Sequence, residues 1–147
     1  MRCLVMLDVC VYVGLVSTLY MTGIVWFAQL VHYPMIDRGD PATFQAFARD
    51  YQRRTLWVVT PALAGEIGSA ILLLGLWPSV QSVVGTATLA AIWVPTAFWI
   101  IPAHLKLKRG YDRELHLRLV RSNLVRSFLW TLRAAAMIWA AVAVPAA

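Results

Sequence analysis

Four apolar runs, each of about 20 residues, limit what this sequence can fold into more than any other feature. About 20 apolar residues in a helix cross a hydrocarbon core of roughly 30 Å, so each run is long enough to span a bilayer. Lipid offers the backbone no hydrogen-bond partners, and a helix satisfies its own N–H and C=O groups. The expected spans cover residues 9–31, 56–77, 82–103 and 124–144, with boundaries that are approximate.

The composition agrees with a membrane protein and argues against a soluble domain. Apolar residues make up 61% of the 147 residues and charged residues only 14%, whereas about 25% of a soluble domain is charged. The apolar run nearest the N-terminus contains Asp8 and continues to Val31, so it is interpreted as a span and not as a cleaved signal peptide. Residues 1–147 are therefore predicted to form one all-α integral membrane domain, a four-transmembrane-helix bundle.

The basic residues predict how this bundle is oriented. Of the 13 Lys and Arg residues, 11 lie between positions 38 and 126, mostly in two long links, 34–55 and 105–123. The two links fall on the same side of the membrane, and the positive-inside rule assigns that side to the cytoplasm. We therefore expect a multi-pass protein of the inner (plasma) membrane with both termini outside the cytoplasm. Charge placed in this way also argues against nucleic-acid binding, despite the net charge of +6.

The first long link is expected to contain an interfacial amphipathic helix at about residues 41–53. Asp40 and Pro41 are typical of a helix start, because the carboxylate can cap free N–H groups and proline needs no partner for its nitrogen. Phe44, Phe47 and Tyr51 then recur at spacings of three and four residues, as on the apolar face of a helix at a membrane surface.

Each span carries one stripe of polar side chains. Plotted at 100° per residue, the four stripes are Thr18, Thr22, Gln29 and Tyr33; Thr55, Glu66 and Ser69; Thr86, Trp93 and His104; and Asn123, Arg126, Trp130 and Arg133. Lipid penalises exposed polar groups, so the stripes are expected to face one another. They predict a polar interhelical pocket in the cytoplasmic half, with its mouth at the cytoplasmic surface and the 41–53 helix across that mouth as a lid.

Glu66 and Arg133 are expected to be partners, because they lie at similar depth, about 13 Å and about 10 Å from the inner boundary. Opposite charges buried in hydrocarbon should pair. Two interpretations stay open: the pair only fixes helix register, or it also holds a ligand or moves a proton.

Nine residues are predicted to form the functional site. The candidate acid–base residues are His32, Glu66 and His104, and the candidate ligand-binding residues are Gln29, Tyr33, Trp93, Arg126, Trp130 and Arg133. The histidines have no metal-ligand spacing, so neither a metal nor a cofactor is assigned. The remaining histidine, His116, lies in the basic link and is expected to be solvated.

Several motifs along the chain carry a resemblance. They are the run from Trp26 to Pro34, Arg53-Arg54-Thr55 followed by Pro61 and Glu66, Pro102-Ala103-His104, Gly110-Tyr111-Asp112, and the run from Leu119 to Arg126 followed by Trp130 and Arg133. In these motifs the chain resembles a group of uncharacterised four-span bacterial membrane proteins. In size and layout it is remotely similar to the anthrone-oxygenase-like membrane family. That resemblance implies a four-span fold and oxygenation of flat aromatic substrates, and it assigns no residue here.

Two functions follow from the predicted pocket. The first is binding of a small hydrophobic or redox-active molecule, such as a quinone-like or aromatic compound, with an oxidoreductase or oxygenase activity as its catalytic form. The alternative is a non-catalytic accessory subunit of a larger respiratory or photosynthetic membrane complex, in which the polar stripes contact membrane protein partners. With either function, the protein is expected to lie in the lipid bilayer.

Overall fold

The computed structural model describes residues 2–36, 43–107 and 109–145, and they are helical almost throughout. In chain order the elements are α1 (Arg2–Phe27), the π-helical segment η1 (Ala28–His32), α2 (Tyr33–Ile36), α3 (Phe44–Leu76), α4 (Val80–Pro95), the π-helical segment η2 (Thr96–Ile100), α5 (Ile101–Leu107) and α6 (Arg113–Ala143). Four continuous stretches are long and apolar enough to cross a membrane: Leu4–Ile36, Phe44–Leu76, Val80–Leu107 and Arg113–Ala143. The predicted all-α bundle of four such helices is confirmed.

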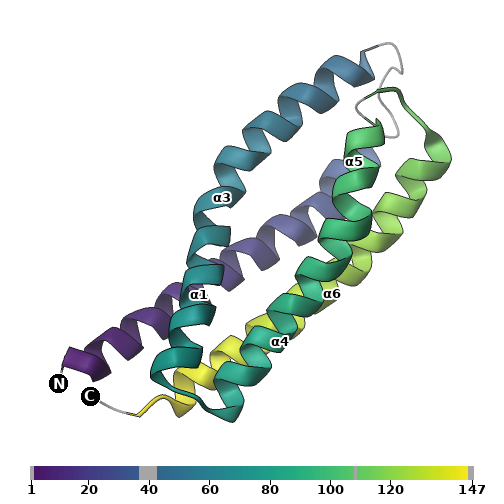
Figure 1. Cartoon of the computed structure of the whole chain (residues 1–147). Coiled ribbons are helices and arrows are strands. Elements are labelled where there is room, and N and C mark those ends of the chain that lie inside the picture. The colour runs from purple at the N-terminus through teal and green to yellow at the C-terminus, as the bar shows by residue number, and fades with distance from the viewer. Residues whose placement is uncertain (1, 37–42, 108, 146–147) are drawn as a thin grey trace.

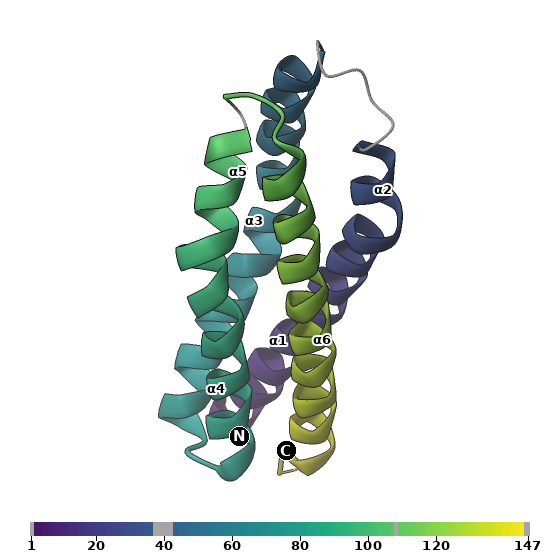
Figure 2. The ribbon, with the colours of Figure 1, turned by 90° about the vertical axis from the view of Figure 1, so that its right-hand side faces the viewer.

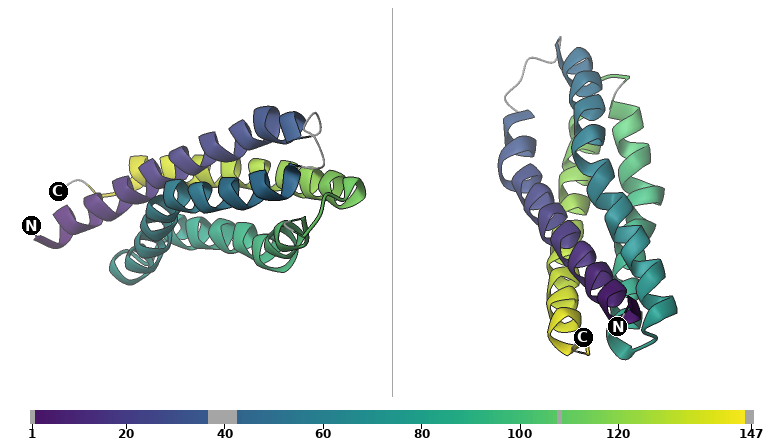
Figure 3. Two further views of the ribbon diagram at one scale, coloured as in Figure 1. Left: turned by 90° about the horizontal axis from the view of Figure 1, so that it is seen from above. Right: turned by 90° about the vertical axis from the view of Figure 1, so that its left-hand side faces the viewer.

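The helices run alternately up and down. Both chain ends and the turn between α3 and α4 lie at one end of the bundle, and the two long links lie at the other (Figure 1). Helix α1 packs against α3 and α6, and α4 packs against α6. Helix α1 crosses the other helices obliquely, as the side views show (Figure 2, Figure 3). The result places four long helices around a shared interior.

The outward faces of the bundle are apolar. Trp57 is 80% exposed and Val142 is 82% exposed. Large apolar side chains that face outward on α3 alone include Leu56, Trp57, Val58, Ile67, Ile71, Leu72 and Leu74. Water would penalise so much exposed apolar surface on a monomer, whereas lipid does not.

The helices extend further into the links than the sequence predicts. Residues 44–53 do not form a helix of their own, because α3 continues without a break from Phe44 to Leu76. Likewise α6 begins at Arg113, where Asp112 accepts a hydrogen bond from the Leu115 N–H at 3.0 Å. The predicted helix start at Asp40 and Pro41 lies outside the described residues. Most of each basic link is therefore a continuation of a long helix.

Two π-helical segments interrupt the regular helices, and each ends two residues before a proline. Segment η1 ends at His32, ahead of Pro34, and η2 ends at Ile100, ahead of Pro102. A proline ring clashes with the carbonyl four residues earlier and has no N–H to donate to it. A wider turn relieves this clash, and such turns occur often at functional sites. Both segments lie in the half of the bundle that carries the long links.

Candidate functional site

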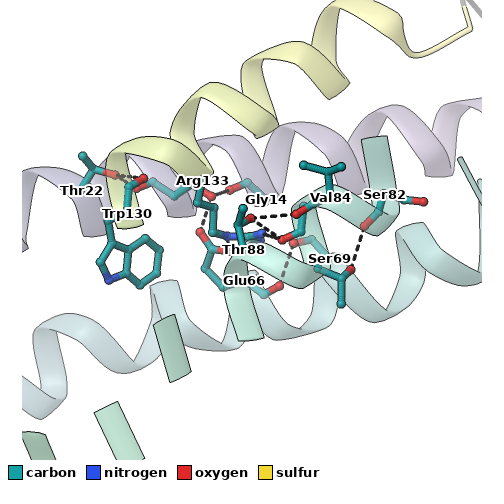
Figure 4. Close-up of polar contacts among 12 residues, drawn as sticks. Gly14, Thr22, Glu66, Ser69, Ser82, Val84, Thr88, Trp130 and Arg133 are labelled. Carbon is teal, nitrogen blue, oxygen red and sulfur yellow. Dashed lines mark hydrogen bonds and ion pairs between the residues drawn. The ribbon is translucent and has the colours of Figure 1, made fainter. Parts of the chain in front are cut away.

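A buried ion pair joins α3 to α6 in the middle of the bundle. Arg133 Nε donates a hydrogen bond to Glu66 Oε2 at 2.6 Å, and Arg133 Nη2 contacts the same oxygen. Arg133 Nη1 donates to the carbonyl oxygen of Gly85 on α4, and the Thr18 hydroxyl on α1 donates to Glu66 Oε1. Glu66 and Arg133 are 0% and 1% exposed. The predicted pairing is confirmed, and it connects all four long helices (Figure 4).

Each charged side-chain atom of this ion pair already has a partner within the protein. Both carboxylate oxygens of Glu66 and all three guanidinium nitrogens of Arg133 have partners. The cavity beside Arg133 has a volume of only about 10 Å³. The contacts of Glu66 and Arg133 are those of a structural pair, because a partner atom already meets each charge.

A much larger cavity of about 410 Å³ lies in the half of the bundle that carries the long links. This volume falls within the roughly 300–1,000 Å³ found for small-molecule sites. Its wall is apolar over most of its area, with side chains from α1, η1, α2, α3, α4, η2, α5 and α6: Met21, Ile24, Val25, Ala28, Tyr33, Tyr51, Gln52, Thr55, Leu56, Val59, Leu63, Ile92, Trp93, Thr96, Ile100, Ile101, His104, Leu105, Asn123, Arg126 and Trp130. Five of the nine predicted site residues line it: Tyr33, Trp93, His104, Arg126 and Trp130.

Three buried polar atoms of the cavity wall have no hydrogen-bond partner within the described part of the chain. They are Arg126 Nε, Trp93 Nε1 and Asn123 Oδ1. The Asn123 Nδ2 group does have a partner, since it donates to Gln29 Oε1 at 2.9 Å. Buried polar groups in native proteins are nearly always paired. Arg126, Trp93 and Asn123 are therefore lining residues with polar groups that the described chain leaves unsatisfied.

The cavity opens through the side of the bundle. Of its lining residues only Leu56, Ile101 and Leu105 are exposed, and they lie on α3 and α5. A hydrophobic cluster that includes Phe44 and Leu119 lies at the end of the bundle next to it. The exposed part of the wall is bordered by apolar side chains on two helices, and the predicted mouth at the cytoplasmic surface stays a prediction.

His32 lies outside this cavity, in a second and smaller space. Its ring stacks on Tyr51 with ring centroids 3.7 Å apart, and Phe47 lies 6.2 Å away. His32 and His104 both line a cavity of about 30 Å³, which shares Tyr33, Tyr51 and Gln52 with the large one. The two histidines are thus brought to one place, as predicted. Of the aromatic residues in the expected lid segment, Phe47 and Tyr51 pack on His32, and Phe44 packs on Tyr111.

His116 differs from its prediction. It is 1% exposed, it lines the small cavity, and its ring lies 5.9 Å from that of Tyr33. Its position on α6 accounts for this, since His116, Leu119, Asn123 and Trp130 recur at helical spacing on the inward face. Three histidines therefore line one small space. Even so, within the described ranges no group of three or more His, Cys, Asp or Glu side chains could hold a metal ion.

The six side chains predicted to share one space fall into four places. Glu66 and Arg133 form the ion pair, and His104 and Arg126 line the large cavity. The other two are His32 in the small cavity and Gln29 as the partner of Asn123. The sequence prediction missed Tyr51, Gln52, Thr96 and His116 as cavity residues. The spacing of three and four residues between Phe44, Phe47 and Tyr51 could have identified Tyr51, because this spacing continues along the inward face of α3.

No family model, curated protein or solved structure matches this chain. The resemblance to uncharacterised four-span bacterial proteins and to the anthrone-oxygenase-like family stays a prediction.

Proposed function

We propose that this chain is an integral membrane protein that binds a small hydrophobic molecule in the 410 Å³ cavity. The observation that carries the proposal is the cavity itself, with its apolar wall and its three buried polar atoms that lack partners among the described residues. Apolar clefts with a few converging polar groups are the usual form of a ligand site. The fully paired Glu66 and Arg133 serve to hold the helices around it.

In the orientation that we propose, the two long links face the cytoplasm. The link end of the bundle carries exposed charges held in local pairs, such as Arg53 with Asp50 at 2.8 Å and Arg118 with Glu114 at 2.5 Å. The opposite end has the short turn before α4, where Ser79 accepts a hydrogen bond from Ser82 N–H. The positive-inside rule assigns the basic end to the cytoplasm. The first turns of α3 would then lie at the inner interface.

Cysteine labelling tests this orientation. In a variant without Cys3 and Cys10, Val80→Cys at the short turn is expected to react with an impermeant maleimide added to intact cells. Arg109→Cys in the long link is expected to react only after the membrane is opened, because basic links are retained in the cytoplasm. Both positions are exposed. Labelling of Arg109→Cys in intact cells, with Val80→Cys protected, would show the reverse orientation.

His104 gives the proposed site a group that can carry a proton. It lines both cavities and therefore lies between the large space and the small one with His32 and His116. Histidine exchanges protons near neutral pH. An oxidoreductase or oxygenase acting on the bound molecule would use it as a general acid or base. The binding function does not depend on this role.

Filling the cavity tests the binding function. Val59→Phe adds a ring inside the space, whereas Val58→Phe places the same ring on the outward face one residue away. We expect Val59→Phe to weaken binding of dodecanoate at least about tenfold, since about 1.4 kcal/mol of lost contact suffices. Val58→Phe should bind as the unchanged protein does. Native mass spectrometry of the purified protein, titrated with dodecanoate, measures both.

A second filling variant guards against a folding defect. Thr96→Phe enters the same space from η2, and circular dichroism reports whether each variant keeps its helices. Equal dodecanoate affinity in Val58→Phe, Val59→Phe and Thr96→Phe would rule out binding in this cavity. The accessory-subunit function would then be the better interpretation.

A further inference from the structure

Arg126 differs from the buried arginine two turns further along the same face of α6. Arg133 donates to a carboxylate and to a carbonyl oxygen. Arg126 forms no ion pair with any described carboxylate, and its buried Nε has no hydrogen-bond partner within residues 2–36, 43–107 and 109–145. An arginine side chain keeps its charge in proteins. Arg126 is partly buried, and a charge held in apolar surroundings without a counter-charge is unfavourable, so Arg126 has a place for an anion.

The rest of the cavity wall does not supply that anion. Its 21 lining residues include no Asp, Glu or Lys, and Arg126 is the one with a permanent charge. Trp93 Nε1 adds a second N–H donor, whose partner is also absent from the described chain. A positive charge with an additional donor favours a head group rich in acceptor oxygens. A cationic ligand would meet an uncompensated like charge here.

The remaining wall is suited to a hydrocarbon chain. Met21, Val25 and Ile92 are buried in the hydrophobic cluster at the inner end of the cavity, with Leu63 packed against them. Transfer of each CH₂ group of such a chain from water to this wall is favourable. A space of about 410 Å³ has room for a single chain and its head group, and not for a two-chain phospholipid.

The position of the opening shows how such a molecule would enter. The exposed rim residues Leu56, Ile101 and Leu105 are all apolar and lie on the lateral surface between α3 and α5. A molecule arriving from water at the link end would meet the buried cluster that includes Phe44 and Leu119. A molecule dissolved in the bilayer meets the rim directly. The rim is therefore a path for a lipid-soluble compound.

From these observations we infer that the occupant is a single-chain amphiphile with one anionic head group, such as a free carboxylate. It enters from the bilayer between α3 and α5 and places its anion on Arg126 and Trp93. This inference rests on the proposed binding function and adds the chemical class of the ligand to it.

The test compares two probes that differ only in the head group, dodecanoate and dodecanol, by native mass spectrometry above neutral pH, where the carboxylate is ionised. The unchanged protein is expected to bind dodecanoate about tenfold or more tightly than dodecanol, because hydrogen bonds to charged groups are the stronger ones. Arg126→Gln keeps a polar side chain without the charge and should remove this preference. Arg126→Lys restores the charge and should recover most of it.

Trp93→Phe tests one head-group contact without filling the cavity. It removes one N–H donor and keeps a ring, so it should lower dodecanoate affinity more than dodecanol affinity. An acid-to-alcohol ratio that stays the same in Arg126→Gln, or a ratio near one in the unchanged protein, would overturn the anionic ligand. Either result would leave the binding function standing if Val59→Phe still weakens both probes. Failure of Val59→Phe to affect either probe would instead count against the cavity as the site.

Discussion

Replacing Glu66 by Gln is expected to lower the free energy of unfolding by about 3–5 kcal/mol, the loss found when one member of a buried pair is removed. The reason is that Arg133 stays buried while its carboxylate partner is gone. In a membrane the loss can be smaller, since unfolded helices also find polar partners. Arg133→Leu should give a comparable loss because it leaves the Glu66 carboxylate with only the Thr18 hydroxyl.

The double variant Glu66→Gln/Arg133→Leu should recover part of the two losses. Unfolding by sodium dodecyl sulfate in mixed micelles, followed by circular dichroism, gives the three free energies and their coupling. Asp50→Asn is the matched control, because it breaks an exposed pair with Arg53 and Arg54 and should change stability little. Losses that simply add would mean that Glu66 and Arg133 are not coupled.

The same variants separate structure from ligand binding. Glu66 and Arg133 have no free atom directed into the large cavity. Folded Glu66→Gln should therefore bind dodecanoate as the unchanged protein does, whereas Arg126→Gln should not. Of the two arginines of the α6 stripe, Arg133 is therefore expected to control stability and Arg126 ligand binding.

The four helices could be predicted because lipid and backbone chemistry leave few alternatives for long apolar runs. Their ends could not, since the basic residues near Tyr51 and His116 suggested links where α3 and α6 are already helical. At the start of both α3 and α6, the inward-facing residues recur at helical spacing through the charged stretch. The charges therefore do not mark the end of the helix.

The polar stripes identified which residues face inward, but not how they divide among separate places. Arg126 and Arg133 are two turns apart on one face of α6, yet one lines a cavity and the other is fully paired. The difference depends on what lies across from each: Glu66 and the Gly85 carbonyl face Arg133. Residue periodicity cannot predict that a backbone carbonyl is a partner of Arg133. It also cannot predict that α3 and α5 lie apart.

Gly14 lies where α1 packs closely against α3 and α6. A Cβ placed on Gly14 would lie 2.8 Å from Ser69 Oγ, 3.2 Å from Ser69 Cβ and 2.8 Å from Met137 Cε. On α3, Gly65 and Ser69 face α1 in this way, while Gly68 has open space around it. A glycine at such a contact allows two helix backbones to approach.

Gly14→Val is therefore expected to lower the free energy of unfolding by about 1–3 kcal/mol, the usual loss from overpacking. Gly23→Val is the matched control in the same helix, because a Cβ there meets nothing within 4 Å. Its effect should stay within about 0.5 kcal/mol, the difference between two poor helix formers. Adding Ser69→Gly removes the contacted side chain and should recover part of the Gly14→Val loss, and an unchanged loss would contradict this contact.

The position of Gly14 also couples it to the ion pair. Thr18 lies one helical turn further along α1, with its hydroxyl 2.8 Å from the Gly14 carbonyl oxygen and in contact with Glu66 Oε1. Moving α1 away from α3 would pull Thr18 from the carboxylate. The losses from Gly14→Val and Thr18→Val should consequently not add, because both remove the Thr18–Glu66 contact. Unfolding of the double variant in mixed micelles measures this, and full additivity would show that the α1 contact and the ion pair act independently.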